Sequence, residues 1–394
     1  MMRRPDGIPV AQLVVDTSGG NASAAASAKG SSSSSRTIEE KPLSPSKKRA
    51  KGGPIQYDPN GMFIEPNEEA CRRFLLANGW TTGLSTSLLK TLAKVPVRFV
   101  VCDDSGSMLT SDGHRRLGQK MVTCSRWAEL TQSLKFHAEL AETARAPTCF
   151  HLLNNAEPVL IGRHDDGGKA YQIFIDILEN ESPGGDTPLC GVIREIAAKI
   201  SELESELRAN GQKAAVIICS DGESSDGDVA EALRPLQHLP CWVVIRLCTD
   251  HEEIVKYWNN IDENLELEMD VLDDIESEAR EIAANNQWLV YTEPLHRIRE
   301  FGCATVKELD LIDESALNAE QMGVVVELLL GGSDTLPHPE VDFDKFIRVV
   351  EARLRATPAE YCTIERKSKP PVSIRGLRAR FGQGSGSSQT CALS

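Results

Sequence analysis

Three side chains that carry oxygen follow an apolar run in the stretch VVCDDSGSM, residues 100–108. Asp103, Ser105 and Ser107 form a D-x-S-x-S pattern, and a frame that starts one residue later meets no serine. A carboxylate and two hydroxyls are hard oxygen donors of the kind that Mg²⁺ prefers. The same residue types also build ordinary turns. The choice between a metal site and a turn therefore depends on what the rest of the chain supplies.

Two further loops offer oxygen ligands next to regular elements. SPGGDTPL precedes a long helical pattern and contains Thr187, and IICSDGESSDGD ends a second apolar run and contains Asp221. Open α/β sheets bind their ligands at the carboxyl ends of the strands. With a strand, a long helix and a strand in this order, the three loops can converge on one crevice. Two carboxylates and three hydroxyls would then face a hard cation.

The elements that must position these loops follow from the apolar pattern. Strands are predicted at VPVRFVVC, TCFHLLNN, PVLIG, KAAVIICS, CWVVIRLC and, at a sheet edge, LELEMDVLDD. Helical patterns lie between most of them, as in AYQIFIDILENE, DTPLCGVIREIAAKISELESELRANGQ and DHEEIVKYWNNI. This alternation predicts an α/β fold with a doubly wound, mostly parallel sheet and helices on both faces.

Composition divides the chain into five segments. We expect a disordered basic tail over residues 1–55, a short helical lead-in over 56–96 and the sheet domain over 97–287. A mainly helical extension follows over 288–362, and a basic, Gly/Ser-rich tail over 363–394. No stretch has the 18 or so apolar residues of a membrane-spanning helix.

Charge and cysteine usage narrow the function classes. Residues 1–55 carry nine basic against four acidic side chains and residues 363–394 carry six against one, so the net charge of −15 leaves −25 between them. A central segment with this much negative charge is unfavourable for nucleic-acid binding through its own surface. The eleven cysteines are scattered without a C-x-x-C pair, which is typical of reduced thiols in a cytosolic or nuclear protein.

The D-x-S-x-S loop, the Thr loop and the Asp loop together resemble the metal-ion-dependent adhesion site of the von Willebrand factor A (vWA) domain, which is also the fold of integrin I domains and copines. The resemblance covers roughly residues 97–287. It implies a Rossmann-like fold and a site for Mg²⁺, with Mn²⁺ as the other candidate ion. All five ligand positions of the family pattern are filled here.

Carried over to this sequence, the resemblance implies a role for each ligand. Ser105 and Ser107 would bind the ion directly through their hydroxyls. Thr187 would bind it directly or through water, as would Asp103 and Asp221. The neighbouring glycines, Gly184 and Gly185, would let the Thr loop approach the ion.

The ligand set suggests how the site would work. Three neutral hydroxyls and two carboxylates leave the ion electrophilic, and protein ligands need not complete its octahedron. An Asp or Glu of a partner protein could take the open position, which is how this family grips its partners. We therefore expect a Mg²⁺-dependent protein–protein interaction module in the cytoplasm, and not an enzyme.

Two other interpretations stay open. One is a hydrolase that uses the same ion, which would need a general base beside it; Glu223 is the nearest acid in sequence. The other is a nuclear scaffold, addressed by a basic import patch made of Lys47, Lys48, Arg49 and Lys51. A nucleotide hydrolase is disfavoured because the chain contains no G-x-x-x-x-G-K-[ST] motif.

The last four residues, CALS, resemble a farnesylation box on Cys391. One prenyl chain binds membranes only marginally, and a basic patch supplies the usual second signal. Such a patch lies upstream, between residues 366 and 380. The tail therefore predicts a possible peripheral membrane tether in addition to the cytoplasmic module.

Overall fold

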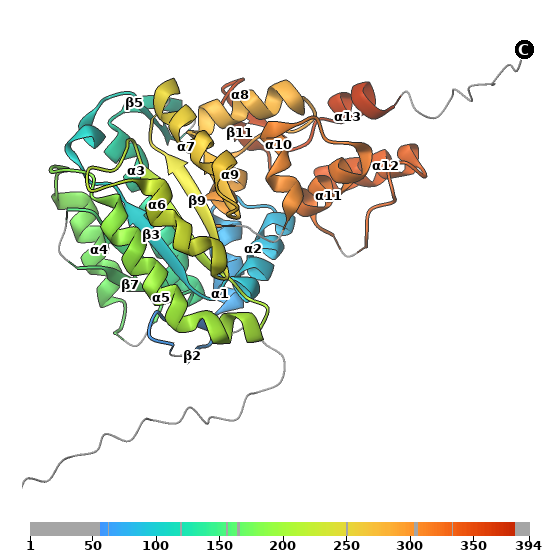
Figure 1. The fold of residues 1–394 in the computed structure, drawn as a ribbon. Coiled ribbons are helices and arrows are strands. Elements are labelled where there is room, and N and C mark those ends of the chain that lie inside the picture. The colour runs from blue at the N-terminus through green and yellow to red at the C-terminus, as the bar shows by residue number, and fades with distance from the viewer. Residues whose placement is uncertain are drawn as a thin grey trace, which may run out of the picture. The chain divides into compact units, whose positions relative to one another are not determined.

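The computed structural model of the chain describes residues 56–382 and leaves out the residues or short segments 62, 119, 155–156, 164–165, 250, 303–305 and 333 within them (Figure 1). The basic patch at residues 47–51 and Cys391 lie outside the described residues. The nuclear-import and farnesylation hypotheses therefore stay predictions. None of the helices within the described ranges combines the length and the apolar character needed to cross a membrane.

A six-stranded sheet forms the centre of the fold, in the order β10–β9–β8–β3–β6–β7. Its strands are β3 (Arg98–Cys102), β6 (Thr148–Leu152), β7 (Val159–Ile161), β8 (Ala214–Ser220), β9 (Cys241–Leu247) and β10 (Met269–Leu272). Every neighbouring pair is parallel except β6–β7. Within this sheet the first strand is β3; the chain then adds β6 and β7 on one side of it and returns to build β8, β9 and β10 on the other. The order reverses between β3 and β8, which is where such sheets bind ligands.

Helices cover both faces of this sheet, which confirms the predicted doubly wound fold. The helices among the described residues are α1 (Glu68–Ala77), α2 (Thr82–Lys94), α3 (Arg126–Ala144), α4 (Lys169–Asn180), α5 (Leu189–Ala209), α6 (Val229–Leu233), α7 (Glu252–Asn264), α8 (Ile275–Asn285), α9 (Glu293–Glu300), α10 (Leu311–Glu314), α11 (Ala319–Leu330), α12 (Phe343–Leu354) and α13 (Ile374–Phe381). The described residues also contain the 3₁₀ helices η1 (Gly106–Leu109), η2 (Arg234–His238) and η3 (Lys307–Leu309).

The alternation of side chains along β3 shows how the two faces are filled. Phe99 and Val101 pack in one core with α5, α6 and α7, whereas Val100 and Cys102 pack in another core with α3 and α4. All five residues of the strand are buried, as expected for a parallel strand covered on both faces. A strand buried on both faces needs a continuous apolar run, and FVVC in β3 is such a run.

A third core joins segments that lie far apart in the sequence. It contains residues of the lead-in and of the extension, for example Leu88 of α2, Leu295 of α9, Val326 of α11, Ile347 of α12 and Leu377 of α13. All five are fully buried. The lead-in and the helical extension therefore fold around a common core, although the sequence treats them as separate segments.

Helices α2 and α11 approach closely because a glycine lies at their contact. A Cβ atom on Gly83 would lie 2.3 Å from the carbonyl oxygen of Leu328 and 2.5 Å from the backbone nitrogen of Gly331. No residue with a side chain fits at this position without moving one helix. The hydroxyl of Thr81, the N-cap residue of α2, also donates a hydrogen bond to the carbonyl of Leu329.

Three short hairpins complete the described elements. They are β1 (Gln56–Tyr57) with β2 (Phe63–Ile64), β4 (Gly113–Leu117) with β5 (Lys120–Cys124), and β11 (Glu360–Cys362) with β12 (Lys367–Lys369). The β4–β5 hairpin lies between the D-x-S-x-S loop and α3, and the sequence analysis does not predict it. Its strands, GHRRL and KMVTC, mix polar and apolar residues without regular alternation and are partly exposed, so they lack the pattern that identifies a strand.

The segment from residue 363 is predicted from its composition to be a basic tail, and the structure describes it as far as residue 382. It contains β12 and α13, and a short antiparallel bridge pairs Val372 with Leu289. The backbone of Ser373 donates to the carbonyl of Trp288 over 2.7 Å. These contacts attach the segment to the start of the extension.

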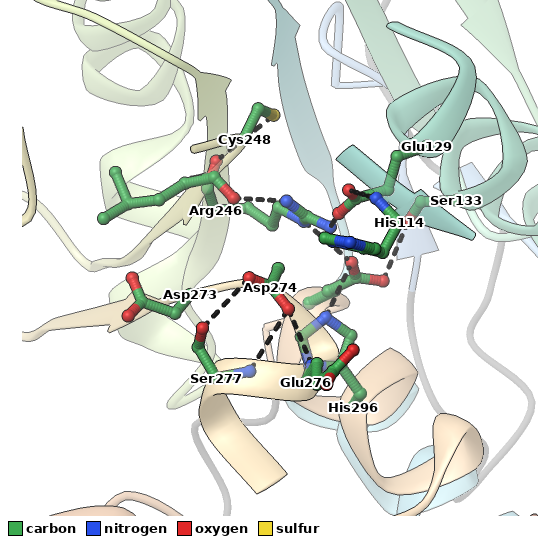
Figure 2. A network of polar contacts seen from close by, with 12 residues as sticks. His114, Glu129, Ser133, Arg246, Cys248, Asp273, Asp274, Glu276, Ser277 and His296 are labelled. Carbon is green, nitrogen blue, oxygen red and sulfur yellow. Dashed lines mark hydrogen bonds and ion pairs between the residues drawn. The ribbon is translucent and has the colours of Figure 1, made fainter. Parts of the chain in front are cut away.

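A buried polar network around Glu300 connects the extension to the sheet domain. Arg246 of β9 donates a hydrogen bond to Glu129 of α3 (Figure 2). It also donates one to Glu300 of α9. Ser133 donates to Glu300 over 2.8 Å, and Arg297 over 2.7 Å. Burial acts to raise the pKa of Glu300, but Arg297 and the nearby histidines hold it well below the usual value. Glu300 is thus a charged carboxylate that is paired on all sides.

A second buried ion cluster surrounds Arg299, the neighbour of Glu300. Its guanidinium donates to Glu278 over 2.5 Å, to Asp313 over 2.8 Å and to Asp270 over 3.3 Å. Three carboxylates share one cation, so the cluster as a whole is acidic. Burial raises the pKa of Glu278 to about 8, with Asp313 and Asp270 adding to the effect and Arg299 opposing it.

The raised pKa of Glu278 predicts that stability depends on pH. Between the ordinary glutamate pKa near 4.3 and about 8, the folded protein holds a proton on Glu278 that the unfolded chain has lost. Stability therefore falls as pH rises through this window. We expect Glu278→Gln to gain stability relative to wild type by up to about 1 kcal/mol per pH unit between pH 6 and 8. Urea unfolding at several pH values measures this difference.

Glu252→Gln on the exposed side of α7 is the control variant, because Glu252 is exposed and pairs with Lys256 one turn away. A constant difference in stability between Glu278→Gln and wild type across pH 6–8 would contradict the raised pKa.

Candidate functional site

The D-x-S-x-S loop begins where β3 ends, and Asp103 is its buried anchor. Asp103 is fully buried, and its backbone nitrogen continues the sheet by donating to the carbonyl of Cys219 in β8. One carboxylate oxygen, Oδ1, accepts from the backbone nitrogen of Ser105 over 2.9 Å. The other, Oδ2, accepts from the hydroxyl of Ser220 over 2.6 Å. Burial raises the pKa of Asp103, while the hydrogen bonds from Ser105 and Ser220 oppose this shift.

The two serines of the pattern lie next to each other and reach the Asp loop. The hydroxyl oxygens of Ser105 and Ser107 are 2.9 Å apart, and Ser107 donates to Oδ1 of Asp221 over 2.8 Å. Asp221 follows β8, so this bond joins the ends of the two strands at which the sheet order reverses. Ser105 is buried and Ser107 is exposed. The hydroxyl pair therefore has one member at the surface.

The Thr loop is attached to the D-x-S-x-S loop by its backbone. Gly184 donates from its nitrogen to the carbonyl of Asp104 over 2.8 Å, and Gly106 donates to the carbonyl of Gly185 over 3.2 Å. Gly185 has a φ of +90°, and a Cβ atom there would lie 2.3 Å from the side chain of Asn154. Glycine is required at this position by conformation and by space.

Thr187 is in turn attached to the Asp loop. Its backbone nitrogen donates to the hydroxyl of Ser225 over 3.2 Å, and its carbonyl accepts from the backbone nitrogen of Ser225 over 2.8 Å. Thr187 is partly buried. The three loops that carry the predicted ligands are thus hydrogen-bonded to one another, and four of the five residues, Asp103, Ser105, Ser107 and Asp221, form one connected chain of bonds.

Asp226 holds the Thr loop and the Asp loop together, a role that the sequence analysis does not identify. Its carboxylate oxygens accept from the backbone nitrogens of Cys190 and Gly191, each over 2.8 Å. These nitrogens belong to the first turn of α5, so Asp226 caps a helix that begins 37 residues earlier. An acid two residues before a predicted helix is ordinarily assigned to that helix, which Asp228 caps instead.

Arg126 is the other residue at the candidate site that the sequence analysis misses. It is the first residue of α3, and its Nη1 donates to Oδ2 of Asp221 over 2.7 Å. Its Nε and Nη2 form a two-pronged pair with Asp112, over 2.7 and 2.6 Å. A cation therefore lies in contact with one of the predicted metal ligands. The signal in the sequence is only an arginine at a helix start, which is common.

Asp104, the second aspartate of the opening stretch, has a separate role. Its Oδ1 accepts from the backbone nitrogen and the side-chain amide of Asn154, over 2.8 and 3.1 Å. Asn154 follows β6, so Asp104 is directed towards the β6–β7 connection and holds it against the site.

The residues present are compatible with Mg²⁺ in donor type and spacing. Mg²⁺ takes octahedral ligands at about 2.0–2.1 Å, so neighbouring ligand oxygens lie about 2.9 Å apart. The hydroxyls of Ser105 and Ser107 have this separation, which is also that of an ordinary hydrogen bond. Within residues 56–382 as described, no three or more His, Cys, Asp or Glu side chains gather as a metal group. The predicted set has only two carboxylates and relies on hydroxyls, so it is not of that type.

No family model and no curated protein matches the chain. Among solved structures, it is similar to the VWA domain of SpRpn10, at 9% identity and a TM-score of 0.31 over 45% of this chain and 86% of that one. It is also similar to a conserved hypothetical protein, BatB from Bacteroides thetaiotaomicron, at 18% identity and a TM-score of 0.28. That alignment spans 38% of this chain and 65% of the BatB chain. Both likenesses are distant, and the fold assignment rests on the strand order instead.

The role of Asp226 leads to a prediction about the Thr loop. Asp226→Ala should cost about 1 kcal/mol of stability, as the loss of a helix cap usually does. It should also speed amide hydrogen exchange over residues 184–191, because the bonds to Cys190 and Gly191 are lost. Exchange followed by mass spectrometry measures both effects on the same sample.

Asp228→Ala is the matched control. Asp228 caps α6 by accepting from Ala230 and Glu231, and it makes no such bond to α5. Equal exchange over residues 184–191 in the two variants would show that Asp226 does not hold the Thr loop.

Proposed function

We propose that this chain is a protein-interaction module of the vWA type. In this proposal Asp103, Ser105, Ser107, Thr187 and Asp221 hold Mg²⁺, and an acidic side chain of a partner protein completes the site. The observation that carries the proposal is the mutual hydrogen bonding of the three loops at the point where the sheet order reverses. This arrangement places the hydroxyl pair beside a buried carboxylate, with Ser107 open to solvent.

The bound ion would supply a Lewis-acidic position for the carboxylate of the partner. The hydrogen bonds among Ser105, Ser107 and Asp221 would orient the two hydroxyls. Only two of the five ligands are carboxylates, which would limit the negative charge around the ion. Asp103 is fixed by Ser105 and Ser220, so its carboxylate needs no rearrangement to keep the loop in place. The exposed side of the site, at Ser107, is where a partner could approach.

Glu223, the acid nearest in sequence that could act as a general base, is an exposed residue. A hydrolase with the same ion remains the alternative function, and it requires a base within hydrogen-bond reach of the attacked atom. The test is hydrolysis of a generic phosphate ester with Mg²⁺, and activity lost in Ser105→Ala/Ser107→Ala would favour the hydrolase.

The proposed setting is the cytoplasm. All nine cysteines among the described residues are free thiols, and eight of them are buried. Burial raises the pKa of Cys102, Cys219 and Cys248, which keeps these thiols protonated and unreactive. Such thiols are compatible with a reducing compartment.

The site predicts that partner binding depends on both the metal and the hydroxyls. Ser105→Ala/Ser107→Ala should abolish Mg²⁺ binding in calorimetry, because two ligands of the ion are lost. The same variant, or EDTA added to wild type, should remove the partners that wild type captures from cell extract with Mg²⁺. Circular dichroism first establishes that the variant is folded.

Ser201→Ala/Ser205→Ala, on the exposed face of α5, is the matched control and should behave as wild type. Partners that bind equally well with EDTA and to the Ser105→Ala/Ser107→Ala variant would rule out a metal bridge.

The CALS sequence predicts a membrane tether, and the basic patch at residues 47–51 predicts import into the nucleus. For the tether, intact mass of the protein made in eukaryotic cells should show loss of the last three residues and a farnesyl adduct on Cys391. Cys391→Ser should abolish both changes and the membrane-bound fraction. An unmodified mass, with the protein concentrated in the nucleus through residues 47–51, would support the nuclear scaffold instead.

A further inference from the structure

Arg126 is a fixed cation within the proposed metal site. Its side chain is 6% exposed and the side chain of Asp221 is 1% exposed, so the pair they form is almost removed from water. Arg126 also reaches Asp112 with two parallel hydrogen bonds. The guanidinium is therefore held on both sides and cannot easily turn away from Asp221.

Formal charges show what this cation does to the site. Of the five proposed ligands only Asp103 and Asp221 are charged, and Arg126 neutralises Asp221 at hydrogen-bond distance. The five ligands and Arg126 together have one negative charge, leaving aside Asp104, whose carboxylate accepts from Asn154, and the partly exposed Asp112, so a divalent ion brings this set to +1. One carboxylate from outside then balances it. Without Arg126 the two aspartates alone would balance the ion, and an anionic ligand would gain little.

Asp112 controls how strongly Arg126 acts. Asp112 and Asp221 compete for the same guanidinium, but the side chain of Asp112 is 32% exposed and its charge is partly screened by water. The hydrogen bonds from Arg126 hold the pKa of Asp112 below its usual value, although burial opposes this shift. Asp112 is thus charged and draws Arg126 towards the surface side of the site.

We propose that Arg126 is the specificity-determining residue of this site. It weakens the binding of the divalent ion alone and strengthens the binding of a carboxylate ligand to the loaded site. Asp112 moderates both effects. This inference rests on the proposed function, which supplies the acidic ligand, and it adds the residue of the chain that sets the preference for that ligand.

The first test measures the ion alone. Calorimetric titration with Mg²⁺, repeated with Mn²⁺, compares wild type with Arg126→Gln and Asp112→Asn at one pH and one salt concentration. Gln can still donate a hydrogen bond to Asp221, so Arg126→Gln removes mainly the charge. We expect it to tighten ion binding about three- to tenfold, and Asp112→Asn to weaken it by a few-fold.

The opposite signs separate tuning from a merely structural role. If Arg126 and Asp112 only hold the loop in place, both variants weaken ion binding, and that result overturns the inference. Arg116→Gln is the control, because Arg116 lies in the adjacent hairpin and pairs with Glu293 at 3.1 Å. Arg126→Lys keeps the charge and should stay close to wild type.

The second test measures a carboxylate ligand on the loaded site. The probe is a fluorescein-labelled peptide of six glutamates at saturating Mg²⁺, followed by fluorescence anisotropy. Arg126→Gln should weaken peptide binding at least threefold while Arg126→Lys preserves it. Equal peptide affinity in wild type and Arg126→Gln would overturn the inference.

The two levels of the proposal fail in different ways. If wild type binds neither Mg²⁺ nor Mn²⁺, the proposed function fails and this inference with it. If wild type binds the ion but the two variants shift its affinity in the same direction or not at all, only the inference about Arg126 fails. Should Arg126→Gln not fold, the double variant Arg126→Gln/Asp112→Asn, which removes both charges of the pair, tests the same sign: it should bind the ion more tightly than Asp112→Asn alone, and weaker binding would overturn the inference.

Discussion

The carboxylate of Asp103 is buried at the end of the central strand, and a buried charge must be satisfied by hydrogen bonds or ions. Ser105 satisfies it from within the loop and Ser220 satisfies it from the neighbouring strand β8. These bonds fix the path of the chain beyond β3 and bring the two serines to Asp221. Every other contact of the site depends on that path.

Contacts away from the candidate site hold helix α3 in position. Helix α3 carries Arg126 at its start and Glu129 one turn later, so it belongs both to the site and to the buried polar network around Glu300. Through Arg246 and Glu300 the network continues into α9 of the extension. The extension shares a core with the lead-in helices, which themselves pack on the end of α3. The position of α3 is thus determined from several sides.

Two ion clusters of opposite character lie next to each other on α9. Glu300 is one carboxylate among several cationic partners, and its pKa is low as a result, despite burial. Arg299 is one cation among three carboxylates, and burial with too few cations raises the pKa of Glu278 and Asp270. The candidate site has a ratio of cations to carboxylates between those of the two clusters. There Arg126 bridges one buried and one partly exposed carboxylate.

The sequence by itself determined the alternation of strands and helices, and with it the fold class, because apolar periodicity is a local property that survives without knowledge of the contacts. It also identified three loops that meet at one edge, since the carboxyl ends of parallel strands share an edge by geometry. Only the tertiary structure decided that Arg126 reaches Asp221 and that Asp226 caps α5, because these pairs are 95 and about 36 residues apart and depend on how the loops pack. The β4–β5 hairpin also depends on tertiary structure. Its strands have no apolar periodicity of their own, and β4 packs against α3.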